Sequence, residues 1–353
     1  MYDRSPDFFQ RRSKIKAAIL QGVKNITVEN VPEPTIEPGG VIIKVHSCGI
    51  CGSDIHTYER GPRAPGLIPG HEFSGDIVEV GAGITGVKKG DRVVAMSART
   101  CGQCYWCKRG EFTRCSKLVM VGLGIPGAFA EYVLVPNFSL GRYAAKLPAN
   151  LTYEEGATAE PVAVGYHAVV QTGPRPGDSC VVIGCGFIGL AIIQILKSMG
   201  VKQVIASGHR PKRLQLAKES GADLVVDGAK EDIVPIVKEL TGNKGADIVY
   251  EVAGTETTFR QSVQMVRKGG QIDVVGLYGQ PFPLSPSAFG GDVSLINCGL
   301  RWDLPGAVDL MKKGKVRTKP LISHEFTLSK VKEAFDTALS AADAIKVIVK
   351  VRE

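Results

Sequence analysis

A short glycine-rich segment is the sequence feature that most constrains the fold. Residues 184–189 have the spacing G-x-G-x-x-G, directly after the apolar run 180–183 and at the start of a helix-like run. In such a motif the first glycine permits a tight turn, the second lets the backbone approach a pyrophosphate, and the third lets helix and strand pack closely. The helix N-terminus adds N–H donors for phosphate. The segment therefore predicts a dinucleotide site; a glycine turn that serves packing alone is the alternative.

The pattern around this segment predicts the sheet to which it belongs. From residue 179 onward, short apolar runs alternate with helix-like runs, which is typical of a parallel sheet with helices on both faces. The strands are expected at 181–183, 204–206, 224–226, 248–252 and 271–275, and two of the helices at 190–199 and 211–220. The fold class is therefore α/β, with a doubly wound parallel sheet in this region.

The first part of the chain has a different pattern, in which Gly and Pro separate short β-type runs. Strands are expected at 15–20, 41–47, 73–80, 91–96 and 130–135, after a polar extension at 1–13. This predicts an all-β, partly barrel-like domain. A helix is expected at 151–160, ended by Pro161. Two helices, at 306–313 and 328–340, and a strand at 345–351 are expected to complete the chain.

The end of the second expected strand bears on which dinucleotide is bound. An NAD site usually places Asp or Glu there to bond the ribose 2′-hydroxyl. This chain has Ser207 and Gly208 instead, followed by His209, Arg210 and Arg213. A small residue makes room for a 2′-phosphate, and arginine binds it with a planar fork of donors. The sequence therefore predicts that NADP(H) is preferred over NAD(H); a solvated basic helix turn is the alternative.

The composition excludes several classes of protein. A chain of 353 residues, 44% hydrophobic and 22% charged, can bury a core in about two domains and is not disordered. The net charge of +8 is scattered and suits an anionic ligand more than nucleic acid. Nine cysteines are too sparse for a disulfide scaffold. The first 16 residues are too charged for a secretory leader, and glycines interrupt the uncharged run 179–196, so a cytoplasmic protein without a membrane span is expected.

Four cysteines lie close together in a loop rich in Gly and charged residues. Their spacing is Cys101-x-x-Cys104-x-x-Cys107-x7-Cys115. Four thiolates can close a tetrahedral zinc site that leaves no position for water, which predicts a structural zinc that clamps the loop. An iron–sulfur cluster and free structural cysteines are the alternatives.

A second group of metal-binding residue types is dispersed along the chain. Cys51 ends one β-type run, His71 and Glu72 begin the next, and Glu160 precedes the dinucleotide region. Cys51, His71 and one of the two carboxylates could hold a zinc with a fourth position open, as catalytic zinc sites do. Because Cys48 and Cys51 have C-x-x-C spacing, a redox disulfide is a competing interpretation.

Together these motifs resemble the zinc-dependent medium-chain dehydrogenase family, which includes alcohol, sorbitol and threonine dehydrogenases. The resemblance begins near Ile15 and depends on residues 51–54, residues 70–72, the four-cysteine loop, Glu160-Pro161 and residues 184–189. It implies a GroES-like β-barrel catalytic domain, residues 1–162 and 301–353, and a Rossmann dinucleotide-binding domain, residues 163–300.

The resemblance also implies roles for individual residues. Cys51, His71 and Glu72 would hold the catalytic zinc, and Glu160 could bind it directly, through water, or in exchange with Glu72. Ser53 would bond the substrate hydroxyl, and His56 would pass the proton to water. Asp54 would orient the zinc-bound histidine. The expected cofactor positions are Gly184, Gly186, Phe187, Ile188, Gly189, Ser207, Gly208, His209, Arg210, Arg213, Val275, Gly276 and Leu277.

Two features bear on the branch of the family. Residues 208–211 look like those of NADP-linked bacterial secondary alcohol dehydrogenases, which generally lack the four-cysteine loop, so the chain mixes two branches. The pair Arg301-Trp302 falls near the position where sorbitol dehydrogenases carry Arg-Tyr beside the substrate, which suggests a polyol.

The expected function is hydride transfer between NADP(H) and a secondary alcohol or polyol, or the matching ketone, with two zinc ions per chain. The alternatives are an NAD-dependent threonine- or sorbitol-type dehydrogenase, a zinc-independent reductase of the same superfamily, and a non-catalytic protein that binds dinucleotide or RNA. The expected partner is a small molecule, with no nucleic acid and no membrane, and the resemblance implies a homotetramer or a dimer.

Overall fold

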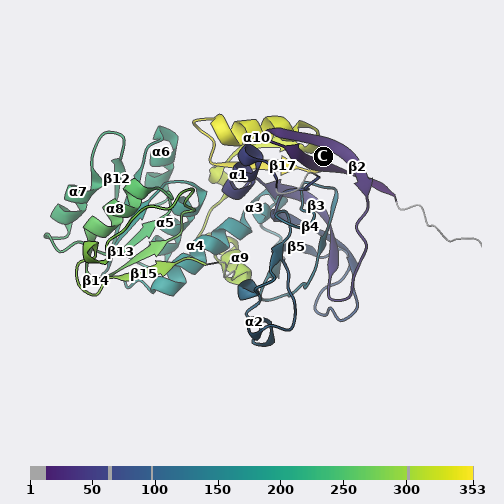
Figure 1. Ribbon diagram of the computed structural model, residues 1–353, viewed down its shortest axis with the longest axis horizontal. Helices are drawn as coiled ribbons and strands as arrows, with labels where there is room; N and C mark the ends of the chain where they lie inside the picture. The colour runs from purple at the N-terminus through teal and green to yellow at the C-terminus, as the bar shows by residue number, and fades with distance from the viewer. Residues whose placement is uncertain (1–12, 63–65, 97, 300–302, 353) are drawn as a thin grey trace, which may run out of the picture.

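The computed structural model describes residues 13–62, 66–96, 98–299 and 303–352. It consists of two bodies, and helix α4 (Ala159–Thr172) runs from one to the other (Figure 1). Residues 1–12 of the extension expected at 1–13, and the pair Arg301-Trp302, lie outside the described residues. The domain bounds taken from the resemblance remain a prediction, and α4 extends across the expected boundary at residue 162.

The second body contains a six-stranded sheet in the order β12-β11-β10-β13-β14-β15, and every neighbouring pair is parallel. The strands are β10 (Ser179–Ile183), β11 (Gln203–Gly208), β12 (Leu224–Asp227), β13 (Ala246–Glu251), β14 (Val266–Val274) and β15 (Ser294–Asn297). The helices are α5 (Phe187–Ser198), α6 (Pro211–Glu219), α7 (Ile233–Leu240) and α8 (Glu256–Met265), with a short helix η2 (Pro286–Ala288). This strand order is that of a Rossmann domain, and the prediction of a doubly wound parallel sheet is confirmed.

The central strand β10 explains why its sequence is apolar without alternation. Val182 packs on one face of the sheet, in the same cluster as Leu190 of α5. Val181 packs on the other face, in the same cluster as Val237 of α7. Because helices cover both faces, each residue of the strand is buried. Across the described ranges, no helix combines the length and the apolar character needed to cross a bilayer.

The first body is built mainly on antiparallel strands, although β16 and β17 pair in parallel. A seven-stranded sheet has the order β16-β17-β3-β4-β5-β9, with β8 paired to β3, and two small sheets pair β1 with β2 and β6 with β7. The strands are β1 (Lys14–Gly22), β2 (Asn25–Pro32), β3 (Val41–Gly49), β4 (Glu72–Val80), β5 (Arg92–Ala95), β6 (Ala98–Arg99), β7 (Val119–Met120), β8 (Tyr132–Val135), β9 (Ala144–Lys146), β16 (Ile322–Thr327) and β17 (Lys346–Lys350). Because β17 pairs with β3, the end of the chain returns to the first body.

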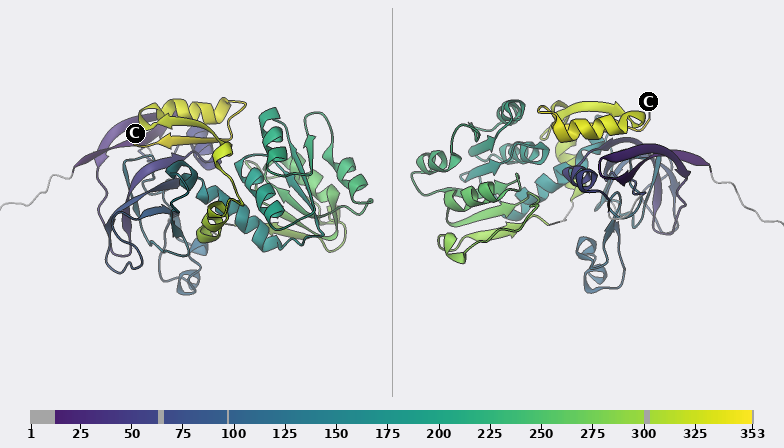
Figure 2. Two further views of the ribbon diagram at one scale, coloured as in Figure 1. Left: turned by 180° about the vertical axis from the view of Figure 1, so that it is seen from behind. Right: turned by 45° about the horizontal axis from the view of Figure 1, so that its top comes forward.

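Several helices accompany this sheet. They are α1 (Gly52–Arg60), α2 (Tyr105–Lys108), α3 (Tyr153–Ala157), α9 (Leu304–Lys312) and α10 (Val331–Ser340), with the short helices η1 (Phe112–Arg114), η3 (Lys319–Leu321) and η4 (Leu328–Lys330). Helix α10, yellow in both views of Figure 2, packs on the first body against β16 and β17. The expectation of an all-β region is therefore incomplete, because α1 follows directly on β3.

Two of the differences between expected and observed helix bounds lie close to the candidate site. A helix over 151–160 that ends at Pro161 is wrong: α3 ends at Ala157, and α4 begins at Ala159 and continues through Pro161. Proline is tolerated there because the first N–H groups of a helix have no intrahelical partner. Helix α5 begins at Phe187 rather than at residue 190, directly after its N-cap Gly186, so Gly189 lies in its first turn.

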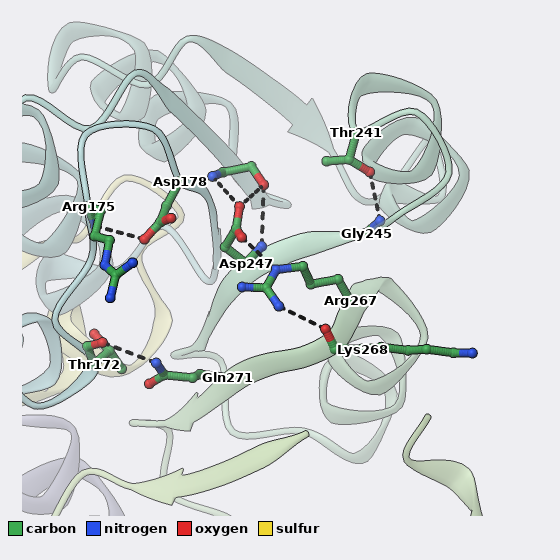
Figure 3. Close-up of polar contacts among 10 residues, drawn as sticks. Thr172, Arg175, Asp178, Thr241, Gly245, Asp247, Arg267, Lys268 and Gln271 are labelled. Atoms are coloured by element: carbon green, nitrogen blue, oxygen red, sulfur yellow. Dashed lines mark hydrogen bonds and ion pairs between the residues drawn. The ribbon is translucent and has the colours of Figure 1, made fainter. Parts of the chain in front are cut away.

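A polar network fixes the amino ends of three neighbouring strands (Figure 3). Asp247 of β13 accepts hydrogen bonds from the backbone N–H and the hydroxyl of Ser179 in β10, at 2.8 and 2.9 Å. It also pairs with Arg267 Nε of β14 at 2.6 Å. Nearby, Gln271 Nε2 donates to the carbonyl of Thr172 at the end of α4. The network therefore fixes the amino-terminal ends of these strands, and the glycine turn lies at their carboxyl-terminal ends.

One carboxyl group is buried inside this domain. Asp273 of β14 is fully buried, and Gln171 Nε2 of α4 donates to both of its oxygens at 2.9 Å. Burial raises the pKa of Asp273 to about 7, although the amide donor acts in the opposite direction. Its proton is therefore bound more tightly in the folded chain than in the unfolded chain, where an Asp titrates near ~4.

We expect the substitution Asp273→Asn to stabilise the fold at pH 8. The free energy of unfolding of the parent chain falls as the pH rises from about 4 to about 7. Over this range the unfolded chain has already lost the proton of Asp273, whereas the folded chain still binds it. Asparagine avoids this loss, so the variant should be more stable by about 1–3 kcal/mol at pH 8 and by much less at pH 4. Denaturant unfolding at both pH values measures the difference.

The matched control is Asp309→Asn, at a half-exposed position on α9. We expect it to change stability by less than about 0.5 kcal/mol at either pH. A stability gain in Asp273→Asn that is independent of pH would contradict the assignment of the shifted pKa to this group.

A candidate metal and dinucleotide site at the junction of the two domains

Three residues of the first body bring metal-binding atoms together. Ligand atoms of Cys51, His71 and Glu72 all lie within 4.8 Å of one another. The antiparallel pair β3–β4 explains this grouping, because Gly49, near the end of β3, is the cross-strand partner of Glu72 at the start of β4. A Cβ atom at position 49 would lie 2.5 Å from Glu72 Oε2. Glycine at this position therefore leaves room for the carboxylate.

Two atoms of this group have no hydrogen-bond partner. His71 Nδ1 and Glu72 Oε1 are buried and unsatisfied within the described part of the chain. An unsatisfied buried polar atom costs about 1–3 kcal/mol, so such atoms usually have a ligand, an ion or water. Thiolate, imidazole and carboxylate are the donors that zinc binds in proteins. The residues present therefore fit a zinc ion with three protein ligands.

Buried acidic groups surround the imidazole. Asp54 Oδ1 lies 3.8 Å from His71 Nδ1, and Asp54 Oδ2 accepts the backbone N–H of Cys51 at 3.0 Å. Burial alone would lower the pKa of His71, but the negative charges of Asp54 and Cys51 outweigh it and raise that pKa well above its usual value. The pocket therefore favours positive charge at the position where a cation would bind. Asp54 lies beside the histidine, as expected from the sequence.

Two further charged residues approach this group from distant parts of the chain. Lys346 of β17 places Nζ 2.6 Å from Glu72 Oε2 and donates to the carbonyl of Ile50 at 3.2 Å. Glu160 of α4 is buried, and burial raises its pKa to about 7. Glu160 is not part of the group within 4.8 Å, although its charge acts on His71. No motif in the sequence predicts a role for Lys346; a lysine inside the apolar run 345–351 was the available signal.

Helix α1 positions the residues expected to move a proton. Its N-cap is Cys51, so Ser53 and His56 lie in its first two turns, directly after the metal-binding cysteine. Ser53 is half-buried and His56 is exposed. At the end of the helix, Arg60 Nη2 lies 3.3 Å from the Cβ position of Gly279, in the other body. Helix α1 therefore faces the dinucleotide-binding domain.

The four-cysteine loop forms a second group of metal-binding atoms. The sulfurs of Cys101, Cys104, Cys107 and Cys115 lie within 4.8 Å of one another. Backbone N–H groups point at these sulfurs, and the N–H of Cys107 lowers the pKa of the Cys104 thiol to about 6. The loop with α2 projects from the body (Figure 1). Four sulfurs this close together, with the thiolate favoured at Cys101 and Cys104, fit a closed zinc site.

The C-x-x-C alternative has little support from the geometry. Cys48 lies in β3, is fully buried, and packs close to Gly70. Burial raises the pKa of the Cys48 thiol well above its usual value. Redox-active thiols need an accessible thiolate of low pKa. The environment of Cys48 is therefore that of a structural cysteine.

The three glycines of the turn meet the three geometric needs of the motif. Gly184 has φ +108°, and a Cβ there would lie 2.8 Å from the backbone N of Ala253. A Cβ at Gly189 would lie 2.0 Å from the carbonyl oxygen of Gly184. At Gly186, by contrast, the only atom as close as 4.0 Å to the Cβ position among the described residues is Nη1 of Arg213. The N-terminus of α5 is therefore accessible to a phosphate group, with Phe187 and Ile188 in its first turn.

The predicted cofactor residues at the other strand ends line the same edge of the sheet. Ser207 and Gly208 end β11, His209 follows, and Arg210 is the N-cap of α6. Arg210 Nη1 donates to the carbonyl of Ala341 at 3.2 Å, and Arg213 Nη2 donates to that of Ala344 at 2.7 Å. After β14, the N–H groups of Val275 and Gly276 bond the carbonyl of Glu251, and Leu277 is exposed.

Comparisons with known proteins agree with this geometry. The family models described as "Alcohol dehydrogenase GroES-like domain" and "Zinc-binding dehydrogenase" match residues 37–149 and 188–313. Sorbitol dehydrogenase of Halalkalibacterium halodurans is 38% identical over 338 residues, 93% of this chain and 96% of that protein. (R,R)-butanediol dehydrogenase of Bacillus subtilis is 35% identical, over 95% of this chain and 99% of that protein.

A solved structure is also similar over almost the whole chain. The structure of a Sinorhizobium meliloti 1021 protein bound to NADP has a TM-score of 0.87 and 31% identity, and the match covers 96% of this chain and 100% of that one. The expected combination of a GroES-like and a Rossmann-type domain is confirmed. On these matches, the chain belongs to the zinc-dependent medium-chain dehydrogenase family.

Proposed function

We propose that the protein transfers hydride between NADP(H) and a secondary alcohol or polyol, or the matching ketone. Cys51, His71 and Glu72 would hold the catalytic zinc. The observation that supports this most strongly is the position of Lys346, whose Nζ lies 2.6 Å from Glu72 Oε2 and 5.1 Å from the ring centroid of Phe187. One side chain thus contacts both the metal-binding group and the start of α5, where a dinucleotide phosphate would bind.

The proposed mechanism assigns a proton pathway to helix α1. When bound, zinc supplies a Lewis acid that lowers the pKa of an alcohol group, and NADP+ supplies the hydride acceptor. Ser53 accepts the hydroxyl proton of the substrate and passes it toward His56, whose exposed ring exchanges it with water. Asp54, whose Oδ1 lies 3.8 Å from His71 Nδ1, would orient the imidazole. The sorbitol and butanediol dehydrogenases among the relatives support a hydroxylated substrate of this class.

The preference for NADP(H) is supported by the strand end at β11. Gly208 carries no carboxylate, and the guanidinium groups of Arg210 and Arg213 lie at the start of α6. The similar S. meliloti structure contains NADP. One observation favours the NAD-dependent alternative: Asp227, at the end of β12, is the cross-strand partner of Gly208 and places a carboxylate at the same edge. That carboxylate is bonded to the N–H of Ala229 and paired with Lys230.

We further propose that the four-cysteine loop binds a second, structural zinc. The loop has four sulfur ligands and no open position, so it would stabilise the fold without taking part in the reaction. The resemblance to the family supports a homotetramer, with a dimer as the alternative.

We expect the substitution Ser53→Ala to block the proton pathway. The turnover number for alcohol oxidation with NADP+ at pH 7 and saturating substrate should fall by about 10²–10³-fold, because a positioned proton acceptor contributes at least that much. Steady-state kinetics measures this loss. Zinc content and the dissociation constant of NADP+ should stay unchanged, and Ser53→Thr, which keeps the hydroxyl, should retain most of the rate. An unchanged turnover number in Ser53→Ala would overturn the role of Ser53.

We expect Gly208→Asp to reverse the cofactor preference. A carboxylate repels the 2′-phosphate and can bond a free 2′-hydroxyl, so the affinity for NADP+ should fall at least about tenfold while that for NAD+ rises. Titration with each cofactor measures both constants.

Gly208→Ala controls for crowding, because any Cβ at this position lies 3.2 Å from the Cβ of Cys185. We expect the alanine variant to change both affinities by the same factor. A parent chain that binds NAD+ more tightly than NADP+ would show that the arginines do not determine the choice of cofactor.

A further inference from the structure

A short segment near the end of the chain contacts both parts of the proposed site. In the 341–346 segment, which joins α10 to β17, the carbonyl of Ala341 accepts a hydrogen bond from Arg210 and that of Ala344 accepts one from Arg213. Lys346, two residues further on, pairs with Glu72. In Figure 1, α6 belongs to the second body and α10 to the first, so these two hydrogen bonds join the two bodies. The segment therefore connects the expected 2′-phosphate site with the metal-binding group.

The contacts of Lys346 determine which oxygen of Glu72 is free. Lys346 is buried, and a buried ammonium group needs close partners to offset the loss of hydration. Its partners are Glu72 Oε2 at 2.6 Å and the carbonyl of Ile50 at 3.2 Å. Glu72 Oε1 is the buried oxygen without a partner. Lys346 thus holds Oε2 and leaves Oε1 for a metal ion.

The contacts of Arg213 show how an anion would affect the segment. Nη2 of Arg213 holds the carbonyl of Ala344, and Nε has no hydrogen-bond partner within the described ranges. Burial, and then the positive charge of Arg210, lower the pKa of Arg213 to about 10, so the two guanidinium groups repel each other. Because a guanidinium has five N–H donors, it can bind a phosphate and keep a carbonyl contact. A phosphate beside both arginines would therefore stabilise them in the positions that hold the segment.

We propose that the 341–346 segment couples the 2′-phosphate site to the catalytic metal site, with Arg213 and Lys346 as positioning residues. A 2′-phosphate on the arginines holds the carbonyls of Ala341 and Ala344. The segment in turn holds Lys346 on Glu72, so that Oε1 faces the metal. This inference rests on the proposed function. Because coupling between two binding sites is reciprocal, bound zinc must strengthen the binding of a 2′-phosphorylated cofactor by the same factor.

The test compares the two cofactors with and without zinc in the full-length protein. The measured quantity is the ratio of the NAD+ dissociation constant to the NADP+ dissociation constant, in zinc-loaded protein and after the catalytic zinc has been removed. We expect zinc to raise this ratio by about tenfold in the parent chain. Dividing one constant by the other removes any effect of zinc on the shared part of the two cofactors.

Three variants locate the coupling. Lys346→Met should make the ratio independent of zinc, and Lys346→Arg, which keeps the positive charge, should restore most of the dependence. Arg213→Gln should also remove it. Lys212→Gln is the matched control, because Lys212 is exposed on the same helix turn and no contact with the 341–346 segment is observed among the described residues; it should behave as the parent chain does.

The outcomes separate the inference from the proposed function. Binding of zinc and both cofactors, with a ratio that does not depend on zinc, would overturn the coupling and leave the proposed function intact. The same zinc dependence in Lys346→Met as in the parent chain would overturn the role of Lys346. Should Lys346→Met fail to fold, a full zinc dependence in Arg213→Gln would overturn the pathway through the segment. Failure of the parent chain to bind zinc or either cofactor would overturn both proposals.

Discussion

The buried ion pair between Lys346 and Glu72 is the interaction on which the arrangement of the site depends. It joins the last strand of the chain to the start of β4, and it exists because β17 returns to pair with β3. Breaking a buried pair by removing one partner usually costs about 3–5 kcal/mol, because the other charge is left without compensation. The pair therefore fixes the orientation of the carboxylate and holds β17 beside the start of β4.

Much of the fold follows from local patterns in the sequence. The glycine motif predicted the strand, the helix and the parallel sheet around them, because a Cβ atom at Gly184 or Gly189 would clash with backbone and the position of Gly186 stays open for a phosphate. The spacing of the four cysteines likewise predicted a cluster, because residues so close in sequence stay close in a loop. Helix limits were less predictable. Pro161 is compatible with the first turn of a helix as well as with its end.

The contacts between distant segments could not be predicted from local patterns. Lys346 lies in an apolar run whose periodicity predicts only a strand, and its partner Glu72 is 274 residues away in the sequence. The same holds for Arg210 and Arg213, whose sequence context predicts a phosphate site but not the carbonyls of the 341–346 segment. The grouping of Cys51, His71 and Glu72 was predictable although they are dispersed in the sequence, because their order matched a family pattern.

Zinc content, measured by elemental analysis on three matched proteins, tests the central claim most directly. If Cys51, His71 and Glu72 hold one ion and the four cysteines hold another, the parent chain contains two zinc ions per chain and Cys51→Ser contains one. Cys104→Ser also contains one, bound at the junction of the domains rather than in the loop. Retention of two zinc ions in Cys51→Ser, or fewer than two in the parent chain, would contradict the assignment of the catalytic metal site.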